Sequence, residues 1–272
     1  MFLSSDLNKA CYLFLKTTIP AFEALNCHLQ AQAPQIHVLR SVLFGLLEEL
    51  SRFVRPGLLK EHKDLLGIDY KSRGAQRDDE DIVIGQEAKH TVDRLLPSER
   101  EQFFEAVRRY MVTACDYIRL KFPLAHDALS NARVADLKSI ETMSIRNVLF
   151  FVERFPALLP VEQQESKDEA LNFLEMEFVK LQAFDIPPNV LQEERADVQW
   201  NTISHIKGAD GLLKFGRISA VMLGILPIPH SNAECERQFS VIKKNRTQFR
   251  ASMSDTTLGN ILLAKCHRGE HC

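Results

Sequence analysis

The sequence has 272 residues, of which 45% are hydrophobic and 26% are charged, and its formal net charge is −2. This is the composition of an ordinary globular protein with enough length for one or two domains. A nearly neutral chain has no overall attraction for nucleic acid, so any DNA-binding surface must be local. No apolar run approaches the roughly 18 residues that a membrane span needs, and the first residues lack a secretory signal pattern.

Cysteine and histidine residues give no sign of a metal site. Six cysteines include no C-x-x-C pair, which favours a reduced, intracellular compartment. His28 and His37 lie among apolar residues, where a packed histidine is more common than a ligand. Residues 266 to 272 contain four soft ligands, but they are crowded on a chain end and suit tetrahedral geometry poorly. We therefore expect neither a metal nor a cofactor.

The N-terminal third predicts helices. Apolar residues up to Leu15 predict a first helix that ends before Pro20, and Phe22 begins the stripe of the next. A long helix is predicted between Pro34 and Pro56. Its apolar residues fall at helical spacing: Ile36, Leu39, Leu43, Leu46, Leu47, Leu50 and Phe53.

The central part alternates between irregular segments and helices. Residues 56 to 98 are the least regular, and the acidic run at 78 to 81 predicts a solvated loop rather than a calcium loop. Ser98 and Glu101 predict a capping box for a helix that ends near Pro123. Its predicted apolar face is Phe103, Val107, Tyr110, Met111, Ala114, Tyr117 and Ile118. Further helices are predicted over residues 139 to 155 and, after Trp200, over residues 212 to 225.

Charge is distributed unevenly over the C-terminal half. Residues 161 to 199 contain ten acidic and three basic side chains, whereas residues 236 to 268 contain two acidic and seven basic ones. Two interpretations remain open. The segments are either separate solvated faces, or the acidic segment docks on the basic one, within one chain or across a dimer.

The stretch from residue 226 to residue 250 has the most distinctive pattern. Pro227 and Pro229 forbid a helix before it, and Ser231 with Glu234 predicts a capping box. Cys235, Phe239 and Ile242 then form one apolar stripe. A second short helix is predicted after a Ser254 cap, with Leu258 and Leu262 on one face. These two faces are predicted either to meet a second subunit or to pack inside the chain against Trp200 and residues 213 to 222.

No stretch shows sustained alternation of apolar and polar residues, so the sequence predicts an all-α fold. The C-terminal stretch also resembles the dimerisation region of hAT-family transposases. That region reads as a small-residue cap, Ala-x-x-Glu-Arg-x-Phe-Ser, a basic stretch and a helix with paired leucines. The matching residues are Trp200, Ser231, Asn232, Ala233, Glu236, Arg237, Phe239, Ser240, Lys244, Arg250, Leu258 and Leu262.

The resemblance implies a division of the chain into three parts. Residues 22 to 39 look like part of the helical insertion domain of the family, so residues 1–160 are expected to be an insertion-like domain. Residues 161–199 would be an acidic linking segment, and residues 200–272 the dimerisation region. In the family the insertion interrupts an RNase H-like fold, whose core strands have no counterpart in this sequence.

The resemblance also implies roles for individual residues. Glu236 matches the third metal-binding carboxylate of the family, but the two aspartates belong to the absent strands, and one carboxylate cannot hold two magnesium ions. We therefore expect no enzymatic activity. Dimer contacts are expected from Phe239, Ile242, Leu258 and Leu262, and weak DNA phosphate contacts from Lys243, Lys244, Arg246 and Arg250.

The expected function is a catalytically incomplete interaction module that forms a homodimer or binds a related hAT protein in the nucleus. Two alternatives remain open. In one, the chain supplies Glu236 to an active transposase whose core is encoded upstream. In the other, it is a decayed reading frame with no selected role.

Overall fold

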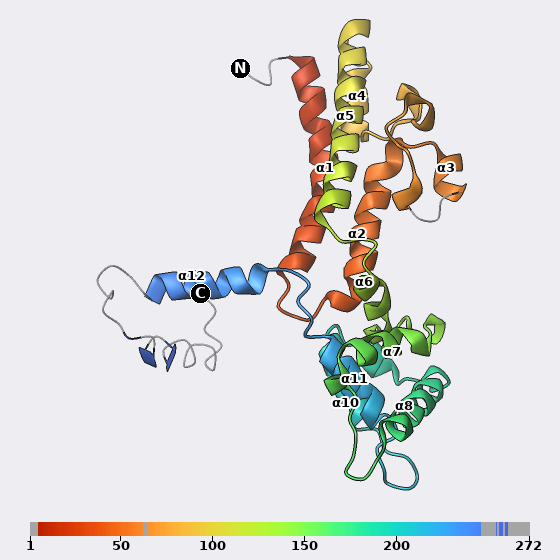
Figure 1. Cartoon of the computed structure of the whole chain (residues 1–272). Helices are drawn as coiled ribbons and strands as arrows, with labels where there is room; N and C mark the ends of the chain where they lie inside the picture. The colour runs from red at the N-terminus through yellow and green to blue at the C-terminus, as the bar shows by residue number, and fades with distance from the viewer. Residues whose placement is uncertain (1–4, 62–64, 246–253, 255, 258, 261–272) are drawn as a thin grey trace.

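The protein is built from α-helices joined by short 3₁₀ turns, as the computed structural model shows (Figure 1). The structure describes residues 5–61, 65–245, 254, 256, 257, 259 and 260. Over these residues it contains no β-sheet, only two isolated β-bridges, Val54 with Gln76 and Lys207 with Leu213. The all-α prediction is confirmed.

The helices are α1 (Asp6–Gln30), α2 (Ile36–Leu50), α3 (Pro56–Glu61), α4 (Gln86–Val92), α5 (Pro97–Lys121), α6 (Asp127–Ala132), α7 (Ile145–Arg154), α8 (Lys167–Gln182), α9 (Pro188–Leu191), α10 (Ala196–Ser204), α11 (Gly216–Ile225) and α12 (Ala233–Asn245).

The helices form an elongated molecule with one projecting arm (Figure 1). The long helices α1, α2 and α5 pack on one another, and α4 packs on α1. The shorter helices α6 to α11 gather at one end of this bundle, and α12 projects sideways from the same end. The buried hydrophobic residues of the bundle and of the shorter helices belong to one continuous cluster, from Ala10 to Leu226.

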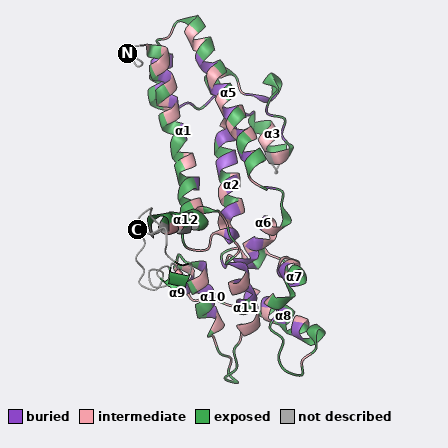
Figure 2. Cartoon of the chain, turned by 60° about the vertical axis from the view of Figure 1, so that its left-hand side comes forward, coloured by how far each residue is buried: buried purple, intermediate pink, exposed green. Residues whose placement is uncertain are grey.

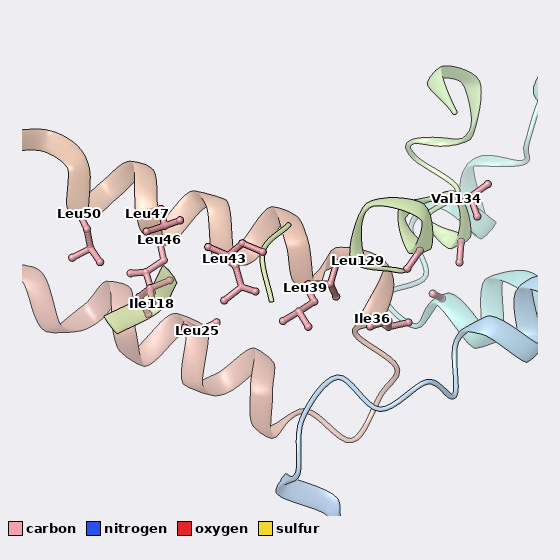
Figure 3. Packing of buried hydrophobic residues seen from close by; sticks show 14 of the residues in the cluster. Leu25, Ile36, Leu39, Leu43, Leu46, Leu47, Leu50, Ile118, Leu129 and Val134 are labelled. Atoms are coloured by element: carbon pink, nitrogen blue, oxygen red, sulfur yellow. The ribbon is translucent and has the colours of Figure 1, made fainter. Parts of the chain in front are cut away.

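Helix α2 forms the centre of this cluster. All seven residues of its predicted apolar stripe, from Ile36 to Phe53, are buried. Figure 3 shows Leu25 of α1 and Ile118 of α5 beside its later turns, and Leu129 of α6 near Leu39. The first turns of α2 also contact the 3₁₀ turn η6 (Arg133–Ala135), so α2 packs against both the long helices and the group of shorter helices.

Helix α1 continues through Pro20, so the predicted break before this residue is wrong. A proline inside a helix removes one hydrogen bond and crowds a carbonyl of the preceding turn. Phe14 and Leu25, which lie on either side of Pro20, are both buried. Burial on both sides of Pro20 outweighs the lost bond, and Pro20 itself is exposed.

Helix α5 begins and packs slightly differently from the prediction. It begins at Pro97, and the backbone N–H of Leu96 donates to Glu99 Oε2 at 3.1 Å, so the predicted cap at Ser98 is displaced by two residues. Proline suits the first helical position because its missing N–H has no helical partner there. Tyr117, predicted as core, is 56% exposed, and Cys115 is buried instead.

The acidic run is exposed as predicted at Asp78, Glu80 and Asp81, but Asp79 is held against α5. Asp79 begins the 3₁₀ turn η5 (Asp79–Asp81) and accepts a hydrogen bond from the largely buried guanidinium of Arg108. Arg73 also donates to Asp79, at 3.4 Å. These charge-assisted contacts order a segment that composition alone predicts to be a loop.

Two further boundaries differ from the predicted ones. Helix α7 begins at Ile145 with Ser144 as its cap, and only a 3₁₀ turn covers Ile140–Thr142. Leu212 and Leu213 precede α11 and are exposed, because they belong to a turn that is closed by the β-bridge between Lys207 and Leu213.

Replacing Pro20 by alanine tests the account of α1. The substitution restores an N–H donor for the carbonyl of Lys16, so the free energy of unfolding is expected to rise by about 2 kcal/mol. Urea denaturation followed by circular dichroism measures the change. Pro97→Ala, at the first position of α5, is the matched control and should change stability by less than about 0.5 kcal/mol. A loss of stability in Pro20→Ala would contradict the account.

Candidate functional site

The start of helix α12 is hydrogen-bonded to the end of α1. We call this start, residues 231 to 237, the root of α12. The Ser231 hydroxyl donates to the carbonyl of Leu29, and Arg237 Nη1 donates to the carbonyl of Gln30 at 3.0 Å. The last carbonyls of an α-helix have no partner within the helix. Two side chains of the C-terminal stretch therefore satisfy groups that α1 leaves open, and this fixes the direction in which α12 departs.

The predicted cap of α12 is changed by this attachment. The Ser231 oxygen accepts from the backbone N–H of Ala233 at 3.3 Å, and the helix begins at Ala233. The backbone N–H of Glu236 bonds the carbonyl of Asn232 at 3.0 Å, so position 232 rather than Ser231 is the cap. The predicted capping box required Ser231 itself at that position. Ser231 is the residue before the cap, and its hydroxyl donates to the carbonyl of Leu29 in α1.

The predicted interface stripe of α12 faces solvent. Phe239 is 69% exposed, Cys235 is exposed and Ile242 is half-buried. Lys243 and Lys244 are exposed in the last turn of the same helix, and Figure 2 shows α12 beside the base of α1. The alternative in which this stripe packs inside the chain against Trp200 is therefore wrong.

Trp200 has a structural place away from α12. It lies in α10 and is fully buried, and its Nε1–H donates to the carbonyl of Ala135 at 2.7 Å. This bond joins α10 to η6, beside the first turns of α2. The structure does not bring Trp200 to the surface that Phe239 occupies.

The remaining predicted site residues either are exposed on α12 or lie outside the described residues. Glu236 is exposed, and its carbonyl accepts from the Ser240 hydroxyl at 2.9 Å. Within the described parts of the chain, no group of three or more histidine, cysteine, aspartate or glutamate side chains is placed to hold a metal ion. Arg246, Arg250, Leu258 and Leu262 lie outside the described residues.

Two histidines, buried His37 and half-buried His230, each have a buried ring nitrogen without a hydrogen-bond partner. His37, at the start of α2, is only 8% exposed, and its Nδ1 has no hydrogen-bond partner. Burial lowers the pKa of His37, Asp136 and Asp197 oppose this, and nearby His230 lowers it further. Burial likewise lowers the pKa of His230, whose Nε2 also lacks a partner. Both rings are therefore favoured in the neutral state.

A groove lies between α8 and α11, with a volume of about 590 Å³. At its base Arg217 makes a bidentate ion pair with Glu165, at 2.9 and 3.0 Å, and both side chains are 11% exposed. A backbone hydrogen bond from Glu162 and the pair with Arg217 lower the pKa of Glu165. Burial raises the pKa of Glu177, whose carboxylate accepts from the backbone N–H of Ile218 at 2.8 Å. The exposed side chains of Phe173, Leu212 and Leu213 line the groove.

Helix α8 has a second apolar face that the sequence analysis missed. Ala170, Leu174, Phe178 and Leu181 face the core. Phe173, Met176 and Val179 are exposed on the other side. A signal for this was present in the sequence, because residues 170 to 181 contain more apolar side chains than one helix face can hold.

Comparison of the chain with models of protein families, with curated proteins and with solved structures gives no match. No helix in the described part of the chain combines the length and the apolar character needed to cross a membrane.

The buried side chain of His37 predicts a dependence of stability on pH. Unfolded histidines take up protons near pH 6.5, whereas folded His37, whose pKa is lowered by burial, takes up its proton only at a lower pH. The contribution of His37 to the free energy of unfolding is complete above about pH 6.5 and is lost as the pH falls below this value. The urea midpoint of the wild type should therefore drop between pH 7.5 and pH 5.5, and the drop should be smaller in His37→Gln. Exposed His90→Gln serves as the control, and an equal drop in all three proteins would contradict the prediction.

Proposed function

We propose that the chain is a transposase-derived dimerisation and interaction module of the hAT type. The observation that carries this proposal is the exposed apolar stripe of α12, on a helix that is fixed at its root and projects from the body (Figure 1). The motif residues Ser231, Ala233, Glu236, Arg237, Phe239 and Ser240 supply the family resemblance in the same stretch.

An exposed phenylalanine beside a half-buried isoleucine favours association. Burial of a side chain of this size stabilises a contact by about 1.5–3 kcal/mol. In a two-fold symmetric dimer each residue contributes twice. The partner is a second copy or a related hAT protein, and the association takes place in the nucleus, by family resemblance.

DNA binding is a minor part of the proposed function. Lys243 and Lys244 are exposed at the end of α12, where they can contact phosphates. The net charge of −2 gives them no support from the rest of the chain. We propose that such binding is weak and independent of DNA sequence.

The chain acts without catalysis in this proposal. Of the three carboxylates in the family site, the resemblance assigns only Glu236 to this sequence, and two-metal chemistry needs a cluster of them. In this proposal the chain corresponds to the helical insertion and the C-terminal helices of an RNase H-like fold, without the strands of its core.

Phe239→Ser tests the proposed dimerisation. Sedimentation velocity should find the wild type as a dimer at micromolar concentration. The substitution removes two buried rings per dimer, about 3–6 kcal/mol, so the dissociation constant should rise at least about 100-fold. Tyr117→Ser, which removes an exposed aromatic side chain from α5, should leave the dimer unchanged. A wild type that stays monomeric at every concentration would refute the proposal.

A nicking assay separates this proposal from the enzymatic alternative. We expect no magnesium-dependent cleavage of supercoiled DNA by the purified chain. Cleavage by the wild type that is lost in Glu236→Ala would favour the alternative, in which this residue belongs to an active site.

A further inference from the structure

We infer that the binding surface for α12 is the groove between α8 and α11 of a second copy of the chain. The inference rests on the proposed dimerisation and names the surface that receives the arm. The exposed face of α12 would lie along α8 of the partner, with Phe239 at the groove and the two lysines over the acidic segment.

The position of α12 excludes a contact with α8 of the same chain. Both views show α12 leaving the base of α1 on one side, whereas α8 lies on the opposite side of the shorter helices (Figures 1 and 2). Its root is held by the bonds from Ser231 and Arg237 to the end of α1. The arm therefore reaches an α8 groove only on another molecule.

The groove suits an aromatic side chain. Phe173, Leu212 and Leu213 supply exposed apolar surface around it, and Met176 extends this surface along α8. The polar groups at its base already have partners, since Arg217 pairs with Glu165 and Glu177 accepts from Ile218. A ring that enters the groove would therefore displace water from apolar atoms without breaking these bonds.

Charge complementarity selects α12 as the occupant. Residues 161 to 185 contain seven acidic and two basic side chains. The buried pair with Arg217 neutralises Glu165, but Glu162, which also lines the groove, remains exposed beside the apolar surface. The exposed apolar stripe of α12 ends in Lys243 and Lys244, in a segment where basic residues outnumber acidic ones seven to two. Opposite charges of this kind orient partners and exclude alternative pairings.

The contact would be reciprocal. If the arm of each copy occupied the groove of the other, a two-fold axis would relate two identical contacts and close the assembly as a dimer. Helix α12 has 13 residues and α8 has 16, so the helices are about 20 and 24 Å long and match in length. Two symmetry-related contacts bury more surface area than a single contact between one helix and one groove.

Complementary charge reversal tests the assignment. The arm variant carries Lys243→Glu and Lys244→Glu, and the groove variant carries Glu162→Lys. Each alone should dimerise about 10-fold to 100-fold more weakly than the wild type, because like charges meet in both contacts. An equimolar mixture should recover the wild-type affinity as a heterodimer, since every arm then meets a groove of opposite charge. Sedimentation with one variant fluorescently labelled measures both quantities.

A control variant separates local from overall charge. Glu105→Lys makes the same change in net charge as the groove variant, at an exposed site on α5. It should dimerise like the wild type and should not restore the arm variant. Circular dichroism at the temperature of the experiment confirms that each variant is folded.

The outcomes distinguish this inference from the proposed function. A monomeric wild type would refute both. A dimer that is weakened by Phe239→Ser but retained in the groove variant, or a mixture that fails to recover, would keep the proposed function and refute the groove as the receiving surface. In that case the arms would pair with each other. Loss of DNA retention by the arm variant without any effect on dimerisation would also refute the inference and assign the lysines to phosphate binding.

Discussion

The packing of α2 is the constraint on which the rest of the structure depends. Its apolar stripe from Ile36 to Phe53 is buried along its whole length. The later turns pack on α1 and α5, and the first turns pack on α6 and η6. One helix thus carries the core from the long bundle into the shorter helices (Figure 3). Because closely packed interiors transmit displacement, the bundle and the shorter helices have a fixed relation, and so do the end of α1 and the groove beside α8.

This fixed base gives the C-terminal arm its significance. A helix with an exposed phenylalanine could lie in any direction if its root were loose. Here the root bonds two backbone carbonyls at the end of α1, and the Trp200 bond to Ala135 holds α10 beside the same region. The arm therefore presents Phe239 in a defined direction, and less conformational entropy is lost when a partner binds. Pre-organisation of this kind favours a specific partner over nonspecific association.

Sequence patterns predicted what depends on local periodicity. The stripe of α2 has one apolar face at helical spacing, so both its existence and its buried residues follow from the sequence. Pro20 misled the prediction because the loss of one local bond was weighed without the burial of Phe14 and Leu25 on either side. The cap of α12 was misplaced because the Ser231 hydroxyl bonds Leu29, roughly 200 residues earlier in the chain. The groove beside α8 was beyond prediction for the same reason, since it joins Glu165 to Arg217 and α8 to a turn near Leu213. The role of Phe239 in binding still rests on the resemblance and on its exposure.

In the proposed dimer, the apolar and charged parts of the arm would contribute different properties to binding. Burial of Phe239 would provide affinity that depends little on salt, whereas the two lysines would contribute to orientation and to the rate of encounter. Exposed charges are screened within about 8 Å at physiological ionic strength, so their contribution is weakened by salt. In the proposed assembly the acidic segment of a partner and a DNA backbone both require Lys243 and Lys244. A copy whose lysines contact the partner has fewer positive charges available for phosphates. Dimerisation and DNA binding through this arm would then oppose each other, and by thermodynamic linkage each would weaken the other by the same factor.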